Sequence, residues 1–379
     1  MLLVVFCGYP LWKYTTNGSI QCLVNYVQSY EKSKTYSQVI WVIHSALQFD
    51  YNNPHKANSK CLYEQQNTVY FITPQNPTSL EKLTEHLGSF KEKMDIISCD
   101  LDAGLSVDRI RTKLPLGEWV HLCTLHMGKN VKLLLDRGIL SNRTSFDEYH
   151  LPETQLFRHA DRYVTVSESE LNWAAQFAHT KQDRDKISIY YPTRSWWNIS
   201  WWTNEMEKSF YMREKYPNKK LLLYVGRITY QKGIDMLLNI SLPSNVHLCI
   251  MSSSEFGDAN LIRKCQEKTQ NDGESFTWIG PYYGEDKISI MKQCDGVICP
   301  SIYEPYGLVG LETILFAKTL LLTSAVDGMM DYLTEGGYVH FDLNITSIQN
   351  AVEHFSRMDE SERRAMISRA HFHAMQTIH

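Results

Sequence analysis

The sequence predicts an α/β fold made of two doubly wound domains. The chain has 379 residues, which is more than one hydrophobic core usually serves. Short, continuously apolar runs alternate with helical patterns along most of it, as in parallel sheets whose two faces are covered by crossover helices. We divide the chain into an N-terminal domain over residues 1–190, a Trp-rich linker over 191–217 and a C-terminal domain over 218–379.

In the first domain, the expected strands are apolar runs that end in small or polar residues. They are Leu2–Gly8, Gln38–His44, Thr68–Thr73, Asp95–Asp100, Trp119–Leu125 and Arg162–Ser167. Helical patterns fall between several of them, at Gly18–Tyr30, Ser79–Glu92 and Ser169–His179. The carboxyl ends of such strands form the edge where open α/β sheets bind ligands, so polar residues that follow a strand are candidates for a site.

The second domain continues the same alternation. Its expected strands are Leu221–Gly226, His247–Ser253, Phe276–Pro281, Gly296–Cys299, Leu320–Ser324 and Tyr338–Phe341. Its expected helices are Glu285–Cys294, an amphipathic run that continues to Phe316, and the terminal helices Thr346–Ser356 and Ser361–Gln376. The order of elements therefore predicts a second parallel sheet with helices on both faces.

Composition excludes several other classes of protein. Apolar residues make up 43% and charged residues 21% of the chain, as in ordinary soluble globular proteins. The formal net charge is −4, so no basic surface for nucleic acid is expected. The nine cysteines include no Cys-x-x-Cys pair and are interpreted as buried, reduced thiols. No apolar run reaches the length of a membrane span, and no secretory signal is recognised. We expect a cytoplasmic protein and leave open a peripheral contact with the inner face of the membrane.

The stretch Cys299–Glu312 carries the strongest chemical pattern. It begins at the end of a strand and leads into a helix, and two prolines fix the turn between them. Gly307 allows the backbone to approach a ligand, and the first amides of the following helix have no partner inside that helix. These amides, which can donate to an anion or a sugar hydroxyl, belong to Gly307, Leu308 and Val309. Glu304 on the loop and Glu312 in the helix can face one crevice.

The motif Pro-Ser-x-x-Glu-Pro-Tyr-Gly-Leu-x-x-Leu-Glu, which starts at Pro300, resembles the Glu-x7-Glu signature of retaining glycosyltransferases of the GT-B fold. The closest class is family 4, the group 1 glycosyltransferases. This resemblance implies two Rossmann-like domains facing a cleft, with the acceptor on the first and a nucleotide sugar on the second. It also implies that Glu304 lies near the donor sugar and that Glu312 holds the donor ribose. The alternative is a capped helix with two solvated carboxylates.

A second motif follows the first strand of the C-terminal domain. Gly226-Arg227 ends the strand, and Lys232-Gly233 comes one short loop later. By resemblance, Arg227 and Lys232 clamp the donor diphosphate, and their chemistry suits this role, because a guanidinium is a fork for phosphate oxygens and an ammonium is a point charge. Taken alone, each would be a solvated cation. The same resemblance adds three donor-binding residues: Gly226, Gly280 near the nucleobase, and Tyr306.

Two candidates lie in the first domain. Asn17-Gly18 stands where the family often has a Gly-Gly pair at the donor diphosphate, so Gly18 is either a donor contact or a plain turn. Thr124-Leu125-His126 resembles a strand-end pattern in which the histidine approaches the donor sugar, and the alternative for His126 is packing. His121 points to the other face of the strand and is expected to be structural. Ser167 and Glu170 have the spacing of a capping box. This helix-capping role is sufficient to explain Ser167, so no catalytic role is assigned to it.

Asp100-Leu-Asp102 matches the metal signature of the other glycosyltransferase fold, GT-A. Asp-x-Asp is also a common tripeptide, and we interpret this one as a polar loop at the end of a strand. We therefore expect no metal and no cofactor other than the nucleotide-sugar substrate.

The linker and the C-terminus depart from the family pattern. Four tryptophans gather in the linker, and they either grip a hydrophobic acceptor, a lipid surface or a partner, or pack between the domains. They are Trp196, Trp197, Trp201 and Trp202. Family members usually continue into a further helix after the point where this chain stops, at His379, so either the sequence is truncated or its tail is shorter.

The predicted reaction is retaining transfer of a hexosyl unit from a nucleotide-diphosphate sugar to a glycan, a lipid-linked saccharide or a protein. We expect Glu304, His126, Arg227 and Lys232 in the catalytic centre. Two other classes stay open. One is a catalytically weak GT-B subunit that binds or stabilises a partner enzyme. The other is a GT-B epimerase or phosphorylase.

Overall fold

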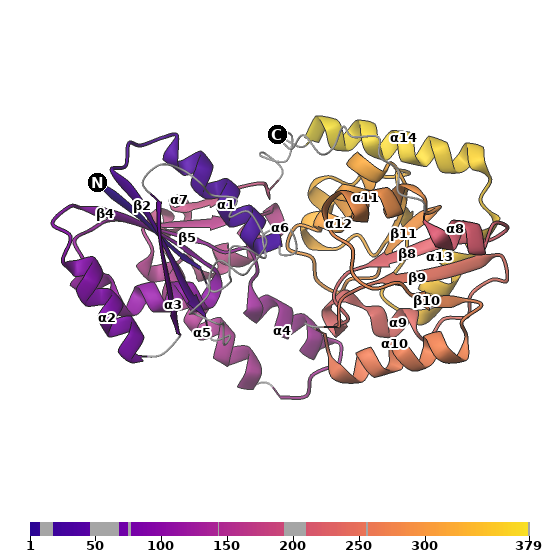
Figure 1. Ribbon diagram of the computed structural model, residues 1–379, viewed down its shortest axis with the longest axis horizontal. Helices are drawn as coiled ribbons and strands as arrows, with labels where there is room; N and C mark the ends of the chain where they lie inside the picture. Colours follow the sequence, from indigo (N-terminus) through magenta and orange to yellow (C-terminus); the bar gives the residue numbers. More distant parts are fainter. Residues whose placement is uncertain are drawn as a thin grey trace. The chain divides into compact units, whose positions relative to one another are not determined.

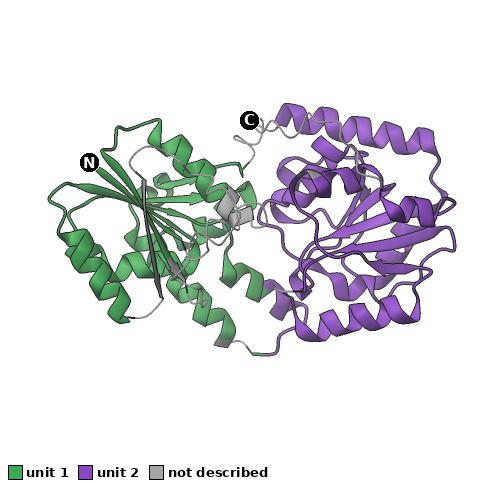
Figure 2. Cartoon of the chain, in the orientation of Figure 1, with its two compact units in different colours: residues 1–132, 142–195 green, residues 133–141, 196–379 purple. Residues whose placement is uncertain are grey.

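The structure is a computed structural model, and it describes residues 1–7, 18–45, 68–74, 77–142, 144–192, 210–254 and 257–377. The chain forms two compact units (Figure 2). Unit 1 comprises residues 1–132 and 142–195, and unit 2 comprises residues 133–141 and 196–379. The linear division expected from the sequence differs at residues 133–141, because three apolar side chains of this segment pack against the core of unit 2. They are Leu133, Leu134 and Ile139.

Unit 1 is built on a seven-stranded sheet in the order β3-β2-β1-β4-β5-β6-β7 (Figure 1). All its pairings are parallel, and β1 lies between β2 and β4, where its six apolar residues are all buried. The strands are β1 Leu2–Cys7, β2 Gln38–Ser45, β3 Thr68–Pro74, β4 Met94–Cys99, β5 Leu116–Leu122, β6 Arg162–Thr165 and β7 Ile187–Ile189. The three-residue strand β7 is the one that the sequence pattern did not predict.

Helices cover both faces of this sheet, with α2, α3 and α5 on one face and α1 on the other (Figure 1). The helices are α1 Gly18–Glu31, α2 Pro77–Gly88, α3 Asp100–Ile110, α4 Met127–Asp136, α5 Thr144–His159, α6 Glu168–Ala174 and α7 Lys181–Asp185. Short 3-10 turns follow α3 and α6, at Arg111–Lys113 and Ala175–Phe177. The core between α3, α5 and the sheet includes Trp119 and Leu156, both fully buried.

Unit 2 has a six-stranded parallel sheet in the order β10-β9-β8-β11-β12-β13. The strands are β8 Lys220–Val225, β9 Val246–Met251, β10 Phe276–Trp278, β11 Gly296–Cys299, β12 Leu320–Thr323 and β13 Val339–His340. The predicted strand Gly296–Cys299 matches β11 at both ends. Such a match is expected where a strand buried on both faces is a continuous apolar run between turns.

The helices of unit 2 also lie on both faces, α9 and α10 on one and α11, α12 and α14 on the other (Figure 1). They are α8 Tyr211–Lys215, α9 Ile234–Leu237, α10 Ala259–Asn271, α11 Gly284–Lys292, α12 Leu308–Glu312, α13 Ile345–Arg357 and α14 Glu360–Thr377. Two 3-10 turns lie at Tyr230–Lys232 and Asp327–Asp331, and α12 continues as a π-helix over Thr313–Ala317. Asp258 and Asn344 cap α10 and α13 through their side chains.

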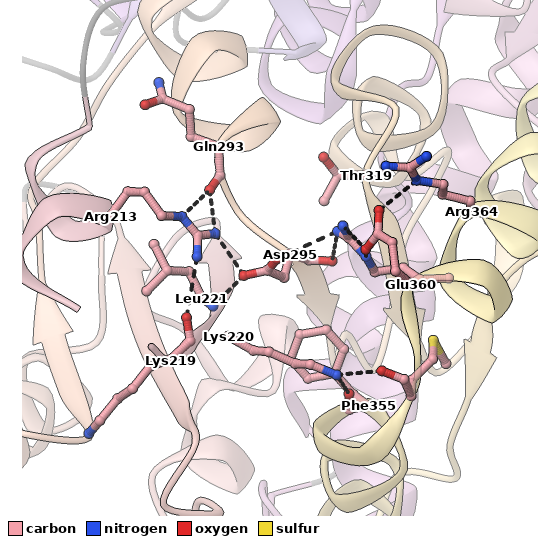
Figure 3. Close-up of polar contacts among 12 residues, drawn as sticks. Arg213, Lys219, Lys220, Leu221, Gln293, Asp295, Thr319, Phe355, Glu360 and Arg364 are labelled. Carbon is pink, nitrogen blue, oxygen red and sulfur yellow. Dashed lines mark hydrogen bonds and ion pairs between the residues drawn. The ribbon is translucent and has the colours of Figure 1, made fainter. Parts of the chain in front are cut away.

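A polar network at the amino ends of β8 and β11 anchors α8 and α14 (Figure 3). The Arg213 guanidinium donates to the carbonyl oxygen of Gln293 and to the carboxylate of Asp295, each at 2.7 Å. Arg363 donates to the carbonyl oxygen of Asp295 at 3.2 Å. The Asp295 carboxylate also accepts the backbone N–H of Leu221 at 2.8 Å. This edge of the sheet is therefore closed by structural contacts, which leaves the carboxyl edge for a site.

Two further expectations concern membranes and thiols. None of the helices in the described ranges combines the length and apolarity that a membrane span requires. The eight cysteines in these ranges are reduced and buried, as the sequence pattern predicted. Cys61 and the four linker tryptophans lie outside the described residues.

Candidate functional site

At the carboxyl edge of unit 2, the loop after β8 lies against the loop after β11. Gly233 adopts a left-handed conformation, with φ of 66°, and a β-carbon there would lie 1.9 Å from the carbonyl oxygen of Pro300. The two loops therefore meet at a distance that only glycine allows. A backbone bond from Ile302 N–H to the carbonyl oxygen of Gln231, at 2.8 Å, joins them a second time.

This contact brings together two of the residues expected in the catalytic centre. Lys232 Nζ lies 2.7 Å from Glu304 Oε1, and Ser301 Oγ donates to the same oxygen at 2.7 Å. The side chains of Lys232 and Glu304 are 18% and 9% exposed. Both bonds that the described residues donate to this carboxylate fall on Oε1, so Oε2 keeps acceptor capacity for a ligand.

Arg227 belongs to the same assembly through Gln231, a buried residue that sequence reasoning missed. The Arg227 guanidinium donates to Gln231 Oε1 at 3.2 Å, and Gln231 Nε2 donates to the carbonyl oxygen of Tyr303 at 3.2 Å. The Tyr224 hydroxyl donates to the carbonyl oxygen of Arg227 at 2.6 Å. No sequence signal marks Gln231, since a glutamine inside a short loop is usually solvated.

The start of α12 is held by the 3-10 turn Asp327–Asp331. Gly307 is the N-cap of α12, with φ of 78°, and a β-carbon there would lie 2.4 Å from Cγ of Met329. The Tyr332 hydroxyl donates to the carbonyl oxygen of Gly307 at 2.6 Å. Burial raises the pKa of Tyr332 well above its ordinary value, so this hydroxyl remains a donor. The ring of Tyr306 is buried edge-on against that of Tyr332.

Glu312, at the end of α12, is held by a lysine that sequence reasoning also missed. Lys287 Nζ, on α11, lies 2.6 Å from Oε1 and 2.7 Å from Oε2 of this carboxylate. A helix was predicted here, over Glu285–Cys294, but the partner of Glu312 was not, because the pairing depends on how two helices pack. The π-helix that begins at Thr313 was not predicted either. Such segments occur often at functional sites.

Gly226 and Gly280, two other expected donor residues, lie on turns of unit 2. Gly226 follows the end of β8 directly. Gly280 lies between β10 and α11 with φ of 77°, and a β-carbon there would meet no atom within 4 Å. Leu308 and Val309 form the first turn of α12, as expected. Whether these residues bind a donor stays a prediction.

In unit 1, the expectation that His126 ends a strand is wrong, because β5 ends at Leu122 and His126 lies in the connection before α4. Its ring is fully buried. Nδ1 lies 2.6 Å from Glu170 Oε2, and Nε2 lies 3.1 Å from the hydroxyl of Tyr163. Lys129 Nζ lies 2.8 Å from the other oxygen of Glu170. A contact between His126 and a donor sugar stays a prediction, and the structure gives both ring nitrogens partners inside unit 1.

The residues of this buried group shift one another's pKa. Burial disfavours the charged form of each residue, but Cys123 and Glu170 raise the pKa of His126 well above its ordinary value. Burial likewise works against the ionised Glu170, yet His126 and Lys129 lower the pKa of this carboxyl to about 2. The pair is therefore an imidazolium and a carboxylate, packed in the interior.

Ser167 and His121 were both expected to have structural roles. Ser167 caps α6 by accepting the backbone N–H of Glu170 at 3.2 Å. The Glu170 side chain turns to His126 and Lys129, so the reciprocal half of the predicted capping box is replaced by this ion pair. His121 is buried and lies 2.9 Å from Ser98 Oγ. Burial, with a smaller effect of His126, lowers the pKa of His121 to about 3, as suits a neutral core histidine.

The Asp-x-Asp tripeptide does not form the expected loop, because α3 begins at Asp100 directly after β4. The Asp100 carboxylate accepts the backbone N–H of Thr124 at 2.9 Å and its hydroxyl at 2.8 Å. Acidic residues in the first turn of a helix are favoured by the helix dipole. Within the described ranges, no group of three or more metal-ligating side chains comes together. Gly18 is the first residue of α1, and its partner Asn17 lies outside the described residues.

Comparison with known sequences identifies the part of the chain that carries this carboxyl edge. Residues 206–371 match the sequence profile of the family described as glycosyl transferases group 1. The matched segment contains both loops of the candidate site, from Gly226 to Gly233 and from Pro300 to Glu312. The predicted resemblance to this family is therefore confirmed.

Individual relatives match over part of their length. A protein of Methanocaldococcus jannaschii named as an uncharacterized glycosyltransferase is 31% identical over 180 residues, which cover 45% of this chain and 44% of the relative. An alpha-maltose-1-phosphate synthase of Mycobacterium tuberculosis is 29% identical over 139 residues, or 33% of this chain and 34% of the relative. The chain thus spans less than half the length of the relatives that it matches.

Solved structures match the whole chain. HepE from Anabaena, in complex with UDP and glucose, aligns with a TM-score of 0.70 at 15% identity, over 99% of this chain and 95% of that one. Sucrose-phosphate synthase from Thermosynechococcus elongatus aligns with a TM-score of 0.70 at 14% identity, over 99% and 94%. At these identities the likeness concerns the fold, and the predicted GT-B fold, with its two Rossmann-like domains, is confirmed. The segment that matches the group 1 family lies in the second of these.

Proposed function

We propose that this chain is a retaining glycosyltransferase that moves a hexosyl unit from a nucleotide-diphosphate sugar to an acceptor. The observation that carries the proposal is the ion pair between Lys232 and Glu304, built from two loops at the carboxyl edge of the unit 2 sheet. Open α/β sheets bind ligands at this edge. The pair places a phosphate-binding cation next to a carboxylate that can accept a sugar hydroxyl.

The donor diphosphate would bind between Arg227, Lys232 and the start of α12. Arg227 and Lys232 come from one loop, which the Gln231 bridge fixes against the segment that bears Glu304. The amides at the start of α12 supply further donors for an anion. The solved structure of HepE contains UDP and glucose, which supports a uridine nucleotide as the first donor to test.

In this proposal, the protein acts mainly through electrostatics. The glycosidic bond to the diphosphate breaks, and Arg227 and Lys232 stabilise the charge that develops on the leaving group. The acceptor attacks from the face that the leaving group still occupies, and a phosphate oxygen takes the acceptor proton, so the anomeric configuration is retained. Glu304 would hold the transferred sugar through Oε2, and Glu312 the ribose. A protein carboxylate is not required as the base, and the cations replace a divalent metal.

We place the reaction in the cytoplasm, with a glycan, a lipid-linked saccharide or a protein as the acceptor and polysaccharide synthesis as its setting. Two alternatives have different outcomes in the same assay. A GT-B subunit that only stabilises a partner would bind a nucleotide sugar without turnover. A GT-B epimerase or phosphorylase would consume the donor without any acceptor or with inorganic phosphate.

The test is to incubate the full chain with UDP-, GDP- and ADP-sugars and to measure release of the nucleoside diphosphate with and without a panel of saccharide acceptors. We expect release from one donor, accelerated by an acceptor, and a product whose anomeric configuration, read by NMR, matches the donor. Lys264→Ala, at an exposed lysine of α10, is the matched control for Lys232→Ala. Binding without release, or an inverted product, would contradict the proposal.

A further inference from the structure

Lys287 and Glu312 form the second lysine–glutamate pair of unit 2. Lys287 lies on α11, which follows β10, and Glu312 lies at the end of α12, which follows β11. Strands β9 and β8 separate β10 from β11 in the sheet, so the pair joins two helices whose strands are not neighbours. Lys287 Nζ reaches both oxygens of the carboxylate, at 2.6 and 2.7 Å. The side chains are 20% and 8% exposed.

We infer that Lys287 is a positioning residue of the donor site, which orients the Glu312 carboxylate toward the nucleotide ribose and offsets its charge beside the diphosphate. This inference deepens the proposed function and rests on it. Lys287 acts through Glu312 and does not itself contact the phosphates. The ligand class is a ribonucleoside diphosphate with an intact 2′,3′-diol.

The Glu312 carboxylate keeps acceptor positions for a ligand beside its bonds to Lys287. An ionised carboxylate offers about four lone-pair positions on its two oxygens. Lys287 occupies one position on each oxygen of Glu312, and among the described residues it is the side chain that binds this carboxylate. One position on each oxygen therefore remains. A free position on either oxygen can accept a ribose hydroxyl.

Lys287 also offsets the negative charge of Glu312. A carboxylate repels a diphosphate at close range, and it does so more strongly where both are partly removed from water. Each glutamate of the site has its own lysine, since Lys232 contacts Glu304 and Lys287 contacts Glu312. The two pairs bring no net negative charge to the site. Arg227 and the first amides of α12 then add to the attraction that Lys232 exerts on the diphosphate.

Lys287 is poorly placed to stabilise its own helix, α11. Lys287 begins the second turn of α11, and its backbone N–H bonds to the carbonyl oxygen of the N-cap residue Tyr283 at 3.4 Å. A cation near a helix amino end is not favoured by the helix dipole. Ordering a lysine side chain and desolvating a buried carboxylate both cost free energy. The position therefore fits a role at Glu312 better than a contribution to the stability of α11.

The experiment compares UDP with 2′-deoxy-UDP by calorimetry on the full chain. If the donor panel identifies another base, the corresponding ribo and deoxy diphosphates replace this pair. In the wild type, UDP should bind more tightly than its deoxy form. Lys287→Met should weaken UDP binding about tenfold, the size expected when a charged hydrogen-bond partner is removed. It should weaken deoxy-UDP binding less, so that the preference for the 2′-hydroxyl shrinks. Lys287→Arg should restore most of the preference.

A matched control and a double mutant separate positioning from direct contact. Lys264→Met removes an exposed lysine of α10 and should change neither affinity. In a Glu312→Gln background, Lys287→Met should have little further effect, because the group that Lys287 orients has been altered. If Lys287→Met lowers the melting temperature, the affinities for UDP and 2′-deoxy-UDP are compared on Lys287→Gln instead. Its amide keeps a hydrogen-bond donor.

Three results have distinct meanings. UDP affinity of Lys287→Met within about twofold of wild type, a change too small for a lost charged contact, would overturn the inference and leave the proposed function intact. Equal losses for both nucleotides that persist in Glu312→Gln would overturn it too, because they would mean a direct phosphate contact. A wild-type chain that binds no nucleoside diphosphate would overturn the proposed function itself.

Discussion

Lys232 Nζ and Glu304 Oε1 lie 2.7 Å apart although 72 positions of sequence separate the two residues. The cation expected at the phosphate and the carboxylate expected at the sugar are therefore one ion pair. Ser301 fixes the carboxylate from its own loop. The ion pair therefore joins the cation expected to stabilise the leaving diphosphate to the carboxylate expected to bind the sugar. Substitution of each residue alone separates the two roles.

Glu304→Gln should slow transfer strongly and leave folding intact. The amide keeps the shape of the side chain but removes the charge that pairs with Lys232 and accepts the sugar hydroxyl. Loss of one interaction of this kind costs on the order of 2–4 kcal/mol in the barrier. The measurement is kcat at equal melting temperature, with Glu267→Gln on the exposed side of α10 as control. A rate within a few fold of wild type would remove Glu304 from the site.

Glu312→Ala should raise KM for the donor more than it lowers kcat. The ribose does not change during the reaction, so this carboxylate binds it equally in the ground and transition states, and uniform binding acts on KM. Steady-state kinetics and calorimetry with the nucleoside diphosphate measure the two effects. An unchanged affinity would contradict the ribose role.

Arg227→Ala and Lys232→Ala should each lose affinity for the nucleoside diphosphate while keeping most of their weak affinity for the nucleoside. The phosphates are the groups that both cations are expected to meet. Competition binding with UDP and uridine separates the two ligands, and Lys264→Ala serves as the surface control. Equal losses for both ligands would indicate a folding defect instead of a phosphate clamp.

The buried pair His126–Glu170 should make stability depend on pH in a defined window. The raised pKa of His126 gives stabilisation that is fully present below its unfolded value and is lost as pH rises through the folded value. The pKa of Glu170, lowered from 4.5 to about 2, gives stabilisation that is present above 4.5 and is lost as pH falls toward 2. The pair should therefore contribute most from pH 4.5 to neutral pH.

Glu170→Gln tests this window by urea unfolding at several pH values. Removing one partner of a buried ion pair costs about 3–5 kcal/mol, and the difference from wild type should shrink below pH 4. Glu85→Gln, at an exposed position of α2, is the control. A difference that stays constant from pH 3 to 7 would mean that the pair is not ionised as described.

The sequence predicted the strands and the carboxyl-edge motifs well because both are local patterns. A strand such as β11 is a short apolar run between turns, and Gly307 is followed by a helix because its neighbours set the turn. The partners of the site residues were not predictable in the same way. Lys287 and Gln231 reach their partners through the packing of helices and loops, and no residue spacing records that contact.

His126 illustrates the same limit in unit 1. The Thr-Leu-His pattern marked a position near a strand end, but no pattern indicated that Glu170 and Tyr163 would bind both ring nitrogens. Ser167 was expected to share a capping box with Glu170. Ser167 does cap the helix, but the Glu170 side chain binds His126 and Lys129 instead of the backbone. A buried charge is stabilised more by an ion pair than by one backbone amide.

The most direct test of the account is the initial rate of donor turnover in excess chelator. Arg227, Lys232 and the first amides of α12 are proposed to meet the charge of the leaving diphosphate, so the rate should stay within about twofold of the untreated rate, less than removal of one stabilising group would cost. Added magnesium or manganese should not raise it. The contradicting result is a collapse that only metal reverses, together with loss of activity in Asp100→Asn or Asp102→Asn, which would move the centre of the chemistry to unit 1.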